Sequence, residues 1–227
     1  MPDMVMENFD AKDPGCVAPK GAAPKGAAFV LAGGKSKRMP FDKQTIRIDG
    51  NLIAVHTADT LSAMFSDVFI VSNAKSLYAE CRYKVIPDEI DGCGPLGGLY
   101  TALCNTPGEY AYVTGCDMPF INLKYIGYLK EQLDKAEKSM DGILTTTNGL
   151  VEPLNAFYHK RLRHLIPPIL SGGRRRMVEL YEGKDLIYVP ESVLKKFDPE
   201  YMMFFNLNTM EDYRRYVSQL ADGRGAH

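Results

Sequence analysis

The 227-residue sequence lacks the features that mark several large classes of protein. Its formal net charge is −1, so it has no excess of positive charge of the kind that nucleic-acid-binding proteins carry. No apolar run approaches the roughly 18 residues that a membrane-spanning helix needs. A basic segment followed by an apolar one is also missing at the N-terminus, so no secretory signal is visible. We therefore expect a cytoplasmic protein that binds neither nucleic acid nor membrane.

Paired cysteines and metal-binding histidines are missing too. The five cysteines are scattered and form no Cys-x-x-Cys pair, which is typical of reduced thiols in a cytosolic protein. The four histidines show none of the spacings of zinc ligands. A zinc site is therefore not expected.

The sequence divides into a short tail and one larger unit. Residues 1–25 include the stretch CVAPKGAAPKGAA, which repeats Ala-Pro-Lys-Gly, has little to bury and predicts a flexible tail. The chain is 45% hydrophobic overall, and residues 26–222 have the size and composition of a single domain.

Short apolar runs alternate with helical patterns through most of this unit. The predicted strands are AAFVLA, DVFIVS, YKVIPD, EYAYVTGCD and DGILTTT, and the predicted helices are NLIAVHTADTLSAMF, LGGLYTALC and NLKYIGYLKEQL. Strands that alternate with helices form a mainly parallel sheet covered on both faces. We therefore predict a Rossmann-like α/β domain of three layers, which binds ligands beyond the carboxyl ends of its strands.

The last third of the sequence is less regular. A strand is expected to run into a helix that Pro167 and Pro168 stop. The run FFNLN predicts a late strand, and TMEDYRRYVSQL predicts a helix. Thr209 and Asp212 form a capping-box pattern at the start of that helix.

The stretch FVLAGGKSKRMPFDKQ places two glycines and several cations directly after the first predicted strand. Gly33 and Gly34 allow the backbone to approach an anion closely, Arg38 can grip phosphate oxygens, and Lys43 adds a point charge. A P-loop is excluded because the required first glycine is Phe29 here. A solvated charged loop is the plain alternative, but the position after a strand favours a polyphosphate ligand.

A second glycine cluster, GCGPLGGL at residues 92–99, formally matches Gly-x-Gly-x-x-Gly. A dinucleotide-binding interpretation is weak, because DEID separates the cluster from the preceding strand and Pro95 lacks a backbone donor. A turn that lets a flat base or pterin lie on the backbone is one better interpretation. A tight turn into a helix is another, and both can hold.

Two acids follow predicted strands. A carboxylate such as Asp117 beside a triphosphate is repulsive unless a metal lies between them, so Asp117 is the leading Mg²⁺ ligand. The alternative for Asp117 is a helix N-cap. Asp88 could accept hydrogen bonds from the N1–H and amino group of guanine, or it could be a simple turn residue.

The later segments offer candidates for a second substrate. Arg174, Arg175 and Arg176 follow two glycines and suit a second phosphate, although a solvated basic face is an equal alternative. Asn206 and Asn208 stand at strand alternation, and their amides could reach the metal shell or the second substrate. Hydrogen bonds that fix a loop are the alternative for both.

Taken in order, LAGGKSKRM with DK, then GPLGGL, CDMPF and NLNT resemble the molybdenum cofactor guanylyltransferase family. Its members are nucleotidyltransferases with a Rossmann-like fold of the glycosyltransferase-A type. The resemblance runs from about Ala27 to Leu220. One departure is Pro40, where the family usually has glycine after Arg-Met. If that N–H normally binds a phosphate, affinity should fall or the loop must bind differently.

The resemblance implies roles for individual residues. Backbone groups of residues 31–33 (Leu31, Ala32 and Gly33), with Gly34 beside them, would hold the nucleotide, and Asp88 would recognise guanine. Arg38 and Lys43 would hold the triphosphate, and Asp117 would carry Mg²⁺. An asparagine of the family falls at Ser72 or Asn73, and we prefer Asn73. Arg175, Asn206 and Asn208 remain the candidates for binding the acceptor.

The resulting prediction is transfer of GMP from GTP to the terminal phosphate of molybdopterin with release of pyrophosphate. A phosphate monoester is already anionic, so catalysis is expected to rest on positioning and charge neutralisation by Arg38, Lys43 and Asp117. Transient contact with cofactor-biosynthesis proteins or molybdoenzymes is a further expectation. The alternatives are transfer from CTP or to another phosphorylated acceptor, a dinucleotide oxidoreductase, and a non-catalytic carrier of the pterin cofactor.

Overall fold

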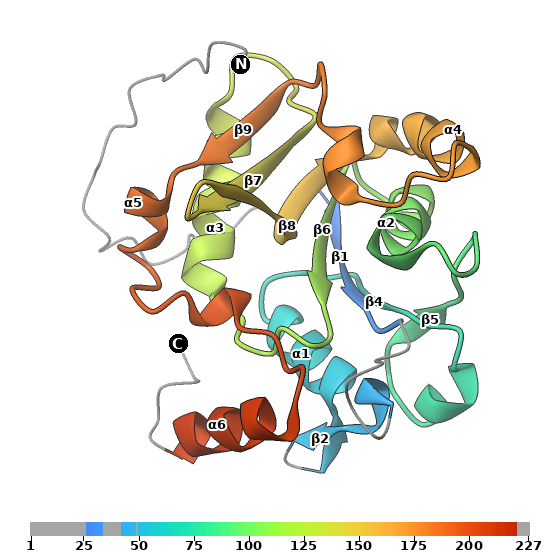
Figure 1. Ribbon diagram of the computed structural model, residues 1–227, viewed down its shortest axis with the longest axis vertical. Helices are drawn as coiled ribbons and strands as arrows, with labels where there is room; N and C mark the ends of the chain where they lie inside the picture. The colour runs from blue at the N-terminus through green and yellow to red at the C-terminus, as the bar shows by residue number, and fades with distance from the viewer. Residues whose placement is uncertain (1–25, 34–41, 49, 222–227) are drawn as a thin grey trace.

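The computed structural model describes residues 26–33, 42–48 and 50–221 (Figure 1). The strands are β1 (Gly26–Leu31), β2 (Arg47–Ile48), β3 (Asn51–Leu52), β4 (Val68–Val71), β5 (Lys84–Ile86), β6 (Tyr110–Gly115), β7 (Gly142–Thr147), β8 (Leu150–His159) and β9 (Leu186–Val189). The α-helices are α1 (Ile53–Leu61), α2 (Gly94–Asn105), α3 (Leu123–Lys135), α4 (Ile166–Ser171), α5 (Glu191–Leu194) and α6 (Met210–Ala221). The 3₁₀ helices are η1 (Lys43–Thr45), η2 (Lys75–Tyr78), η3 (Lys160–Leu165), η4 (Met177–Leu180) and η5 (Met202–Phe204).

Seven strands form one sheet in the order β5-β4-β1-β6-β8-β7-β9. All neighbouring pairs are parallel except the two that involve β8, which runs antiparallel to both β6 and β7. Strand β8 is reversed because a tight turn joins it to β7. That turn places Asn148 and Gly149 at φ values of 50° and 75°. The prediction of a mainly parallel central sheet is confirmed.

Alternating side chains of the buried strands feed two separate cores. In β1, Ala28 and Val30 join a cluster with residues of α1, α3 and α6, whereas Ala27 and Phe29 join a cluster with residues of α2 and α4. Helices therefore cover both faces of the sheet, which makes three layers. This burial on both faces explains why β1 and β6 read as continuous apolar runs in the sequence.

The topology gathers polar residues at one edge of the sheet. Strands β1, β4, β5, β6 and β7 all end at this edge because they run parallel to one another. The residues that follow them include Gly33, Asn73, Asp88, Asp117 and Asn148. Ligands of open α/β sheets bind at this carboxyl edge.

Two predicted elements of the last third are wrong. The run FFNLN forms no strand, because η5 ends at Phe204 and the backbone N–H of Leu207 donates to the Asp117 carbonyl oxygen at 2.8 Å. Pro167 and Pro168 do not stop a helix; they lie in the first turn of α4, where a missing N–H costs nothing. Strand β9 lacked a clear pattern in the sequence and was missed.

Within residues 26–33, 42–48 and 50–221, no helix combines the length and the apolar character needed to cross a bilayer. Cys81, Cys93, Cys104 and Cys116 are free thiols. Residues 1–25, predicted to be a tail, lie outside the described part of the chain.

A buried asparagine links the sheet to the C-terminal segment. Asn155 lies in β8 at φ 55° and is fully buried, in the stretch where the pairing of β7 with β8 shifts register. Its Oδ1 accepts a hydrogen bond from the Tyr112 hydroxyl at 2.9 Å, and its Nδ2 donates to the Met203 carbonyl oxygen at 2.6 Å. Asn155 therefore fixes η5, which leads directly into residues 205–208.

We expect Asn155→Gly to lower the free energy of unfolding by about 2–3 kcal/mol, because it leaves two buried polar partners without a hydrogen bond. Asn155→Ala should cost about 1 kcal/mol more, because an L-residue with a Cβ is strained at positive φ. Urea denaturation measures both changes. Asn148→Gly, at an exposed turn position with similar φ, is the matched control and should change stability by less than about 0.5 kcal/mol. Full stability of Asn155→Gly would show that only the backbone conformation matters.

Candidate functional site

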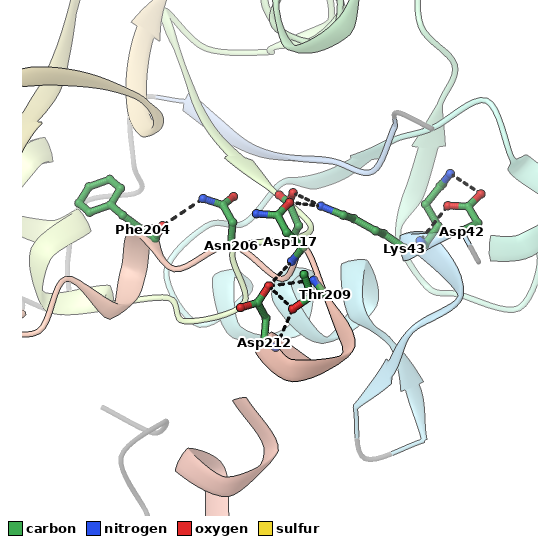
Figure 2. Close-up of polar contacts among 9 residues, drawn as sticks. Asp42, Lys43, Asp117, Phe204, Asn206, Thr209 and Asp212 are labelled. Carbon is green, nitrogen blue, oxygen red and sulfur yellow. Dashed lines mark hydrogen bonds and ion pairs between the residues drawn. The ribbon is translucent and has the colours of Figure 1, made fainter. Parts of the chain in front are cut away.

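The centre of the candidate site is the ammonium group of a lysine, which donates hydrogen bonds to two side-chain oxygen atoms (Figure 2). The Nζ of Lys43 lies 3.0 Å from Asp117 Oδ2 and donates a hydrogen bond of 2.7 Å to Asn208 Oδ1. The Lys43 side chain is 15% exposed and that of Asp117 is 28% exposed. Three segments that are far apart in the sequence therefore meet at one partly buried cation.

Lys43 is positioned by its neighbours in η1. Asp42 caps this 3₁₀ helix by accepting a hydrogen bond from the Gln44 backbone N–H at 3.0 Å. The Gln44 side chain is buried, and its Oε1 accepts hydrogen bonds from the hydroxyls of Ser72 at 2.6 Å and Tyr78 at 3.3 Å. These bonds anchor the turn beneath Lys43. The sequence analysis missed Gln44, whose partners cannot be identified from local spacing.

Asp117 and Asn208 are held together by the backbone. Asp117 follows β6, and its carbonyl oxygen accepts the hydrogen bond from Leu207 N–H. Asp212 Oδ2 accepts from the N–H groups of Asn208 at 3.0 Å and Thr209 at 2.8 Å, and the Thr209 hydroxyl accepts from Asp212 N–H at 3.1 Å. The predicted capping box is thus confirmed, and it fixes Asn208 beside Lys43.

The alternative interpretation of Asp117 as a helix N-cap is wrong. Helix α3 is capped by Asn122, whose side chain accepts a hydrogen bond from Tyr125 N–H. The Asp117 carboxylate instead points to Lys43. Burial, and then the charge of Asp117, raises the pKa of the neighbouring Cys116 thiol, which keeps that thiol protonated.

A second polar group lies at the ends of β4 and β5. Asn73 Nδ2 donates to Asp91 Oδ1 at 2.5 Å and to Asp88 Oδ2 at 3.4 Å, and Asn73 Oδ1 accepts from Asp88 N–H at 2.9 Å. A Cβ added to Gly33 would lie 3.7 Å from Asp88 Oδ2, so this group borders the end of β1. Ser72, the other position considered for the family's asparagine, is buried against Gln44.

Two causes raise the pKa of Asp88 above its ordinary value. Burial of the carboxyl group is the larger, and repulsion from the Asp91 carboxylate is the second. Hydrogen-bond donors that approach such a carboxylate stabilise its charged form. The paired N–H groups of a nucleobase edge are donors of that kind.

The backbone of Leu31 and Ala32 is already used by the sheet. The Leu31 carbonyl oxygen accepts from Cys116 N–H at 3.0 Å, and the Ala32 N–H donates to the Val71 carbonyl oxygen at 2.9 Å. Gly33 is exposed at the end of β1. Gly34, Arg38 and Pro40 lie outside the described residues, so their predicted roles stay predictions.

The second glycine cluster forms a tight turn into α2, as one of the two favoured interpretations held. Gly92 and Gly94 have φ values of 68° and 60°. A Cβ on Gly97 would come within 2.8 Å of the Cys93 side chain, and a Cβ on Gly98 within 3.0 Å of Leu31. Gly98 therefore lets α2 pack closely on β1, and Gly97 lets the turn before α2 pack closely on the helix.

The three acceptor candidates are not brought together. Arg175 donates from Nη1 to the Gly92 carbonyl oxygen and contacts Cys93 Sγ at 3.7 Å, so it braces the turn before α2. Asn208 lies at Lys43, and the exposed Asn206 donates to the Phe204 carbonyl oxygen at 3.1 Å. The two asparagines lie in an irregular segment, and not on the strand that their alternation predicted.

The oxygen atoms around Lys43 suit a hard divalent cation such as Mg²⁺. Within the described ranges, no three Asp, Glu, His or Cys side chains gather as a complete metal cage. Mg²⁺ does not require one, since it binds one or two carboxylates and takes its remaining ligands from phosphates and water. Asp117 Oδ2 and Asn208 Oδ1 already surround a cation, the Lys43 ammonium. A carboxylate and an amide oxygen are suitable Mg²⁺ ligands.

Residues 28–186 match the family of MobA-like NTP transferase domains. A protein of Peptoclostridium acidaminophilum named "Probable molybdenum cofactor guanylyltransferase" is 39% identical over 194 aligned residues, and the match covers 84% of this chain and 88% of that protein. A "Molybdenum cofactor guanylyltransferase" of Syntrophotalea carbinolica is 37% identical over 202 aligned residues, and the match covers 89% of this chain and 95% of that protein.

A solved structure shares the fold. It is the crystal structure of molybdopterin-guanine dinucleotide biosynthesis protein A from Archaeoglobus fulgidus, which superposes with a TM-score of 0.75. The superposition covers 86% of this chain and 99% of that one at 24% sequence identity. This likeness agrees with the three-layer architecture described above.

We expect Asp91→Asn to lower the pKa of Asp88 while leaving it above the ordinary value, because burial is the larger cause. A carboxylic acid whose pKa is raised in the folded state binds more protons there than in the unfolded chain. The free energy of unfolding therefore falls as pH rises from the ordinary pKa through the raised one, and this fall should be smaller in the variant. A ¹³C NMR titration of the carboxyl groups measures the pKa.

Asp67→Asn, at the opposite edge of the sheet, is the control and should leave the titration of Asp88 unchanged. An unchanged Asp88 pKa in Asp91→Asn would show that the two carboxylates do not interact.

Proposed function

The chain belongs to the family of MobA-like NTP transferase domains, and from this membership we propose that it transfers GMP from GTP to the terminal phosphate of molybdopterin. Pyrophosphate is the second product. The observation that carries the proposal is the Lys43 ammonium held between Asp117 and Asn208 at the carboxyl edge of the sheet. The names of the two similar proteins, both molybdenum cofactor guanylyltransferases, support the choice of substrates.

In this proposal the guanine binds at the ends of β4 and β5. Asp88 accepts hydrogen bonds from the guanine N1–H and amino group, since both donors lie on one edge of the base. Donors that approach Asp88 also offset the charge that burial and Asp91 make unfavourable. Asn73, bonded to both acids, holds their side chains in place. Cytosine presents a different edge, so the same acids select against CTP.

The triphosphate lies over the loop after β1. Lys43, which follows this loop, supplies a point charge to the triphosphate. Arg38, whose position is not described, supplies planar N–H donors for two phosphate oxygens. The backbone of Gly33, with Gly34 beside it, completes this cradle. Together these groups neutralise the charge that develops on the departing pyrophosphate.

Asp117 would hold Mg²⁺, with Asn208 close enough to share in its coordination. When bound, this ion supplies positive charge that draws phosphate oxygens together and polarises the phosphorus under attack. The position of Asp117 after the buried strand β6 fixes the carboxylate that would bind the ion. The hydrogen bond from Leu207 N–H to its carbonyl oxygen keeps that position.

The chemical step is an in-line displacement at the α-phosphorus. An oxygen of the molybdopterin phosphate forms the new P–O bond, and the bond to the β-phosphate oxygen breaks. The attacking phosphate is already anionic near neutral pH, so no side chain needs to remove a proton. The residues of this chain act by orienting the substrates and by offsetting charge. None of the site residues named above is a histidine that would be needed as a general base.

We expect pyrophosphate release to require molybdopterin and Mg²⁺ and to be faster with GTP than with ATP, CTP or UTP. Asp117→Asn should slow release about 100-fold or more, because it removes the charge that holds the metal ion. Asp67→Asn, which alters an exposed carboxylate at the amino edge, should retain the wild-type rate. A coupled pyrophosphate assay measures all of these rates.

Selectivity for CTP in that assay would keep the chemistry and change the donor nucleotide. Absence of release with every nucleotide, from folded protein and intact molybdopterin, would overturn the proposal.

We also expect Asp88→Asn to lower kcat/KM for GTP about tenfold or more, because an amide presents a donor where guanine requires an acceptor. Values for ATP should change much less, so the preference for GTP should shrink. Steady-state kinetics with both nucleotides measure the ratio. Equal losses for GTP and ATP would assign Asp88 a structural role in place of base recognition.

A further inference from the structure

The side chain of Gln44 links the two parts of the proposed nucleotide site. Gln44 is 8% exposed and directly follows Lys43 in η1. Its shortest hydrogen bond is to Ser72, which directly precedes Asn73 after the end of β4. We propose that Gln44 is a positioning residue, which sets the place of Lys43 relative to the guanine-binding residues so that one GTP molecule contacts both. The inference rests on the proposed function, because only that function assigns a guanine and a triphosphate to these two groups.

The amide of Gln44 is bonded through both its oxygen and its nitrogen. Its Oε1 accepts from the hydroxyls of Ser72 at 2.6 Å and Tyr78 at 3.3 Å, and its Nε2 donates to Asp42 Oδ2 at 3.3 Å. The Ser72 hydroxyl oxygen in turn accepts from the Ala74 N–H at 3.1 Å. Ser72 and Tyr78 are buried, so breaking these bonds leaves polar groups without water to replace the lost partner. The turn η1 is therefore held against the end of β4.

The end of β4 also carries the residues assigned to the base. The Ser72 N–H donates to the Ile86 carbonyl oxygen at 2.9 Å, which ties the end of β4 to the end of β5. Asn73 then donates to Asp88 and Asp91 from its side chain. A shift of η1 along β4 would therefore change the distance between the ammonium group of the turn and the carboxylate that meets the guanine.

The position of η1 depends on side chains, because this turn has three residues and belongs to neither sheet. Figure 2 shows the Lys43 side chain extending from the turn to Asp117. That contact cannot hold the turn during the reaction, since Lys43 exchanges Asp117 for a phosphate in the proposed function. The bonds of Gln44 to Ser72 and Tyr78 involve no group assigned to a substrate, so they persist when the nucleotide binds.

Correct spacing has an energetic consequence that can be measured. The guanosine and the triphosphate of GTP are joined covalently, so binding of one part places the other at a high effective concentration. This gain is lost when the geometry prevents both parts from binding at once. A change in spacing therefore weakens the whole nucleotide while each part alone still binds. A residue that touches the ligand, or one that only stabilises the fold, has no such selective effect.

The test compares the α,β-methylene analogue of GTP with its two parts, guanosine and inorganic tripolyphosphate, on the full-length protein with Mg²⁺. Gln44→Met keeps the length of the side chain and removes the hydrogen bonds of the amide. We expect it to raise the dissociation constant of the analogue about tenfold or more and those of the two parts by less than about twofold. Calorimetry measures the analogue, and ¹H–¹⁵N NMR titration measures the two weaker ligands.

Two further variants complete the comparison. Ser72→Ala removes the shorter bond to Gln44 Oε1 and should give the same selective loss at a smaller size, which keeps the test available if Gln44→Met does not fold. Tyr125→Phe removes a buried hydrogen bond of 2.7 Å to Thr145, between α3 and β7, and is the matched control. It should leave all three dissociation constants unchanged.

The outcomes separate the inference from the proposed function. If the analogue and one of its parts lose affinity equally, Gln44 supports a single subsite and the inference is overturned. It is also overturned if the variants keep the full advantage of the analogue over its parts. In both cases the wild type still binds guanosine and releases pyrophosphate, so the function stands. A wild type that binds the analogue no more tightly than tripolyphosphate would instead contradict the function, and the inference with it.

Discussion

The contact of Lys43 with Asp117 and Asn208 is the interaction on which the arrangement of the site depends. It joins the turn after the first strand, the end of the central strand β6 and the segment before α6. Gln44 anchors the turn that carries Lys43, and Asp212 anchors the segment that carries Asn208. Asp117 is tied to that second segment by the hydrogen bond from the Leu207 N–H, so Asp117 and Asn208 are fixed to each other before Lys43 meets them. Such preorganisation is what a reaction driven by charge neutralisation requires.

The reversal of β8 sets how the carboxyl edge is divided. If β8 ran parallel to its neighbours, its own C-terminal end would lie at this edge. The short turn after Thr147 brings Glu152 there from the beginning of the strand instead. The irregular pairing that follows turns Asn155 inward to hold Met203. One topological feature thus places an acid at the carboxyl edge and supports the segment that leads to Asn208.

The sequence predicted the features of the site that depend on the order of strands and helices. It did not predict the residues whose roles depend on contacts between distant segments. Alternating strands and helices were enough to predict the layers and to place Asp88 and Asp117 at one edge. Gln44 and Asn155 could not be found, because a buried amide acquires its meaning from partners in distant segments. The run FFNLN misled because its polar alternation imitates a strand, while its backbone is bonded to Asp117. The roles of Arg38 and Pro40 remain sequence predictions.

The partial burial of the central ion pair constrains how the site can change on binding. An exposed pair contributes about 0–1 kcal/mol, but removing one partner from a buried pair leaves a costly uncompensated charge. Lys43 and Asp117 lie between these limits, with side chains 15% and 28% exposed. Lys43 can therefore leave Asp117 for a phosphate only when another cation replaces it. In the proposed mechanism Lys43 would bind a phosphate while Asp117 would hold Mg²⁺, so neither charge would be left alone in the site.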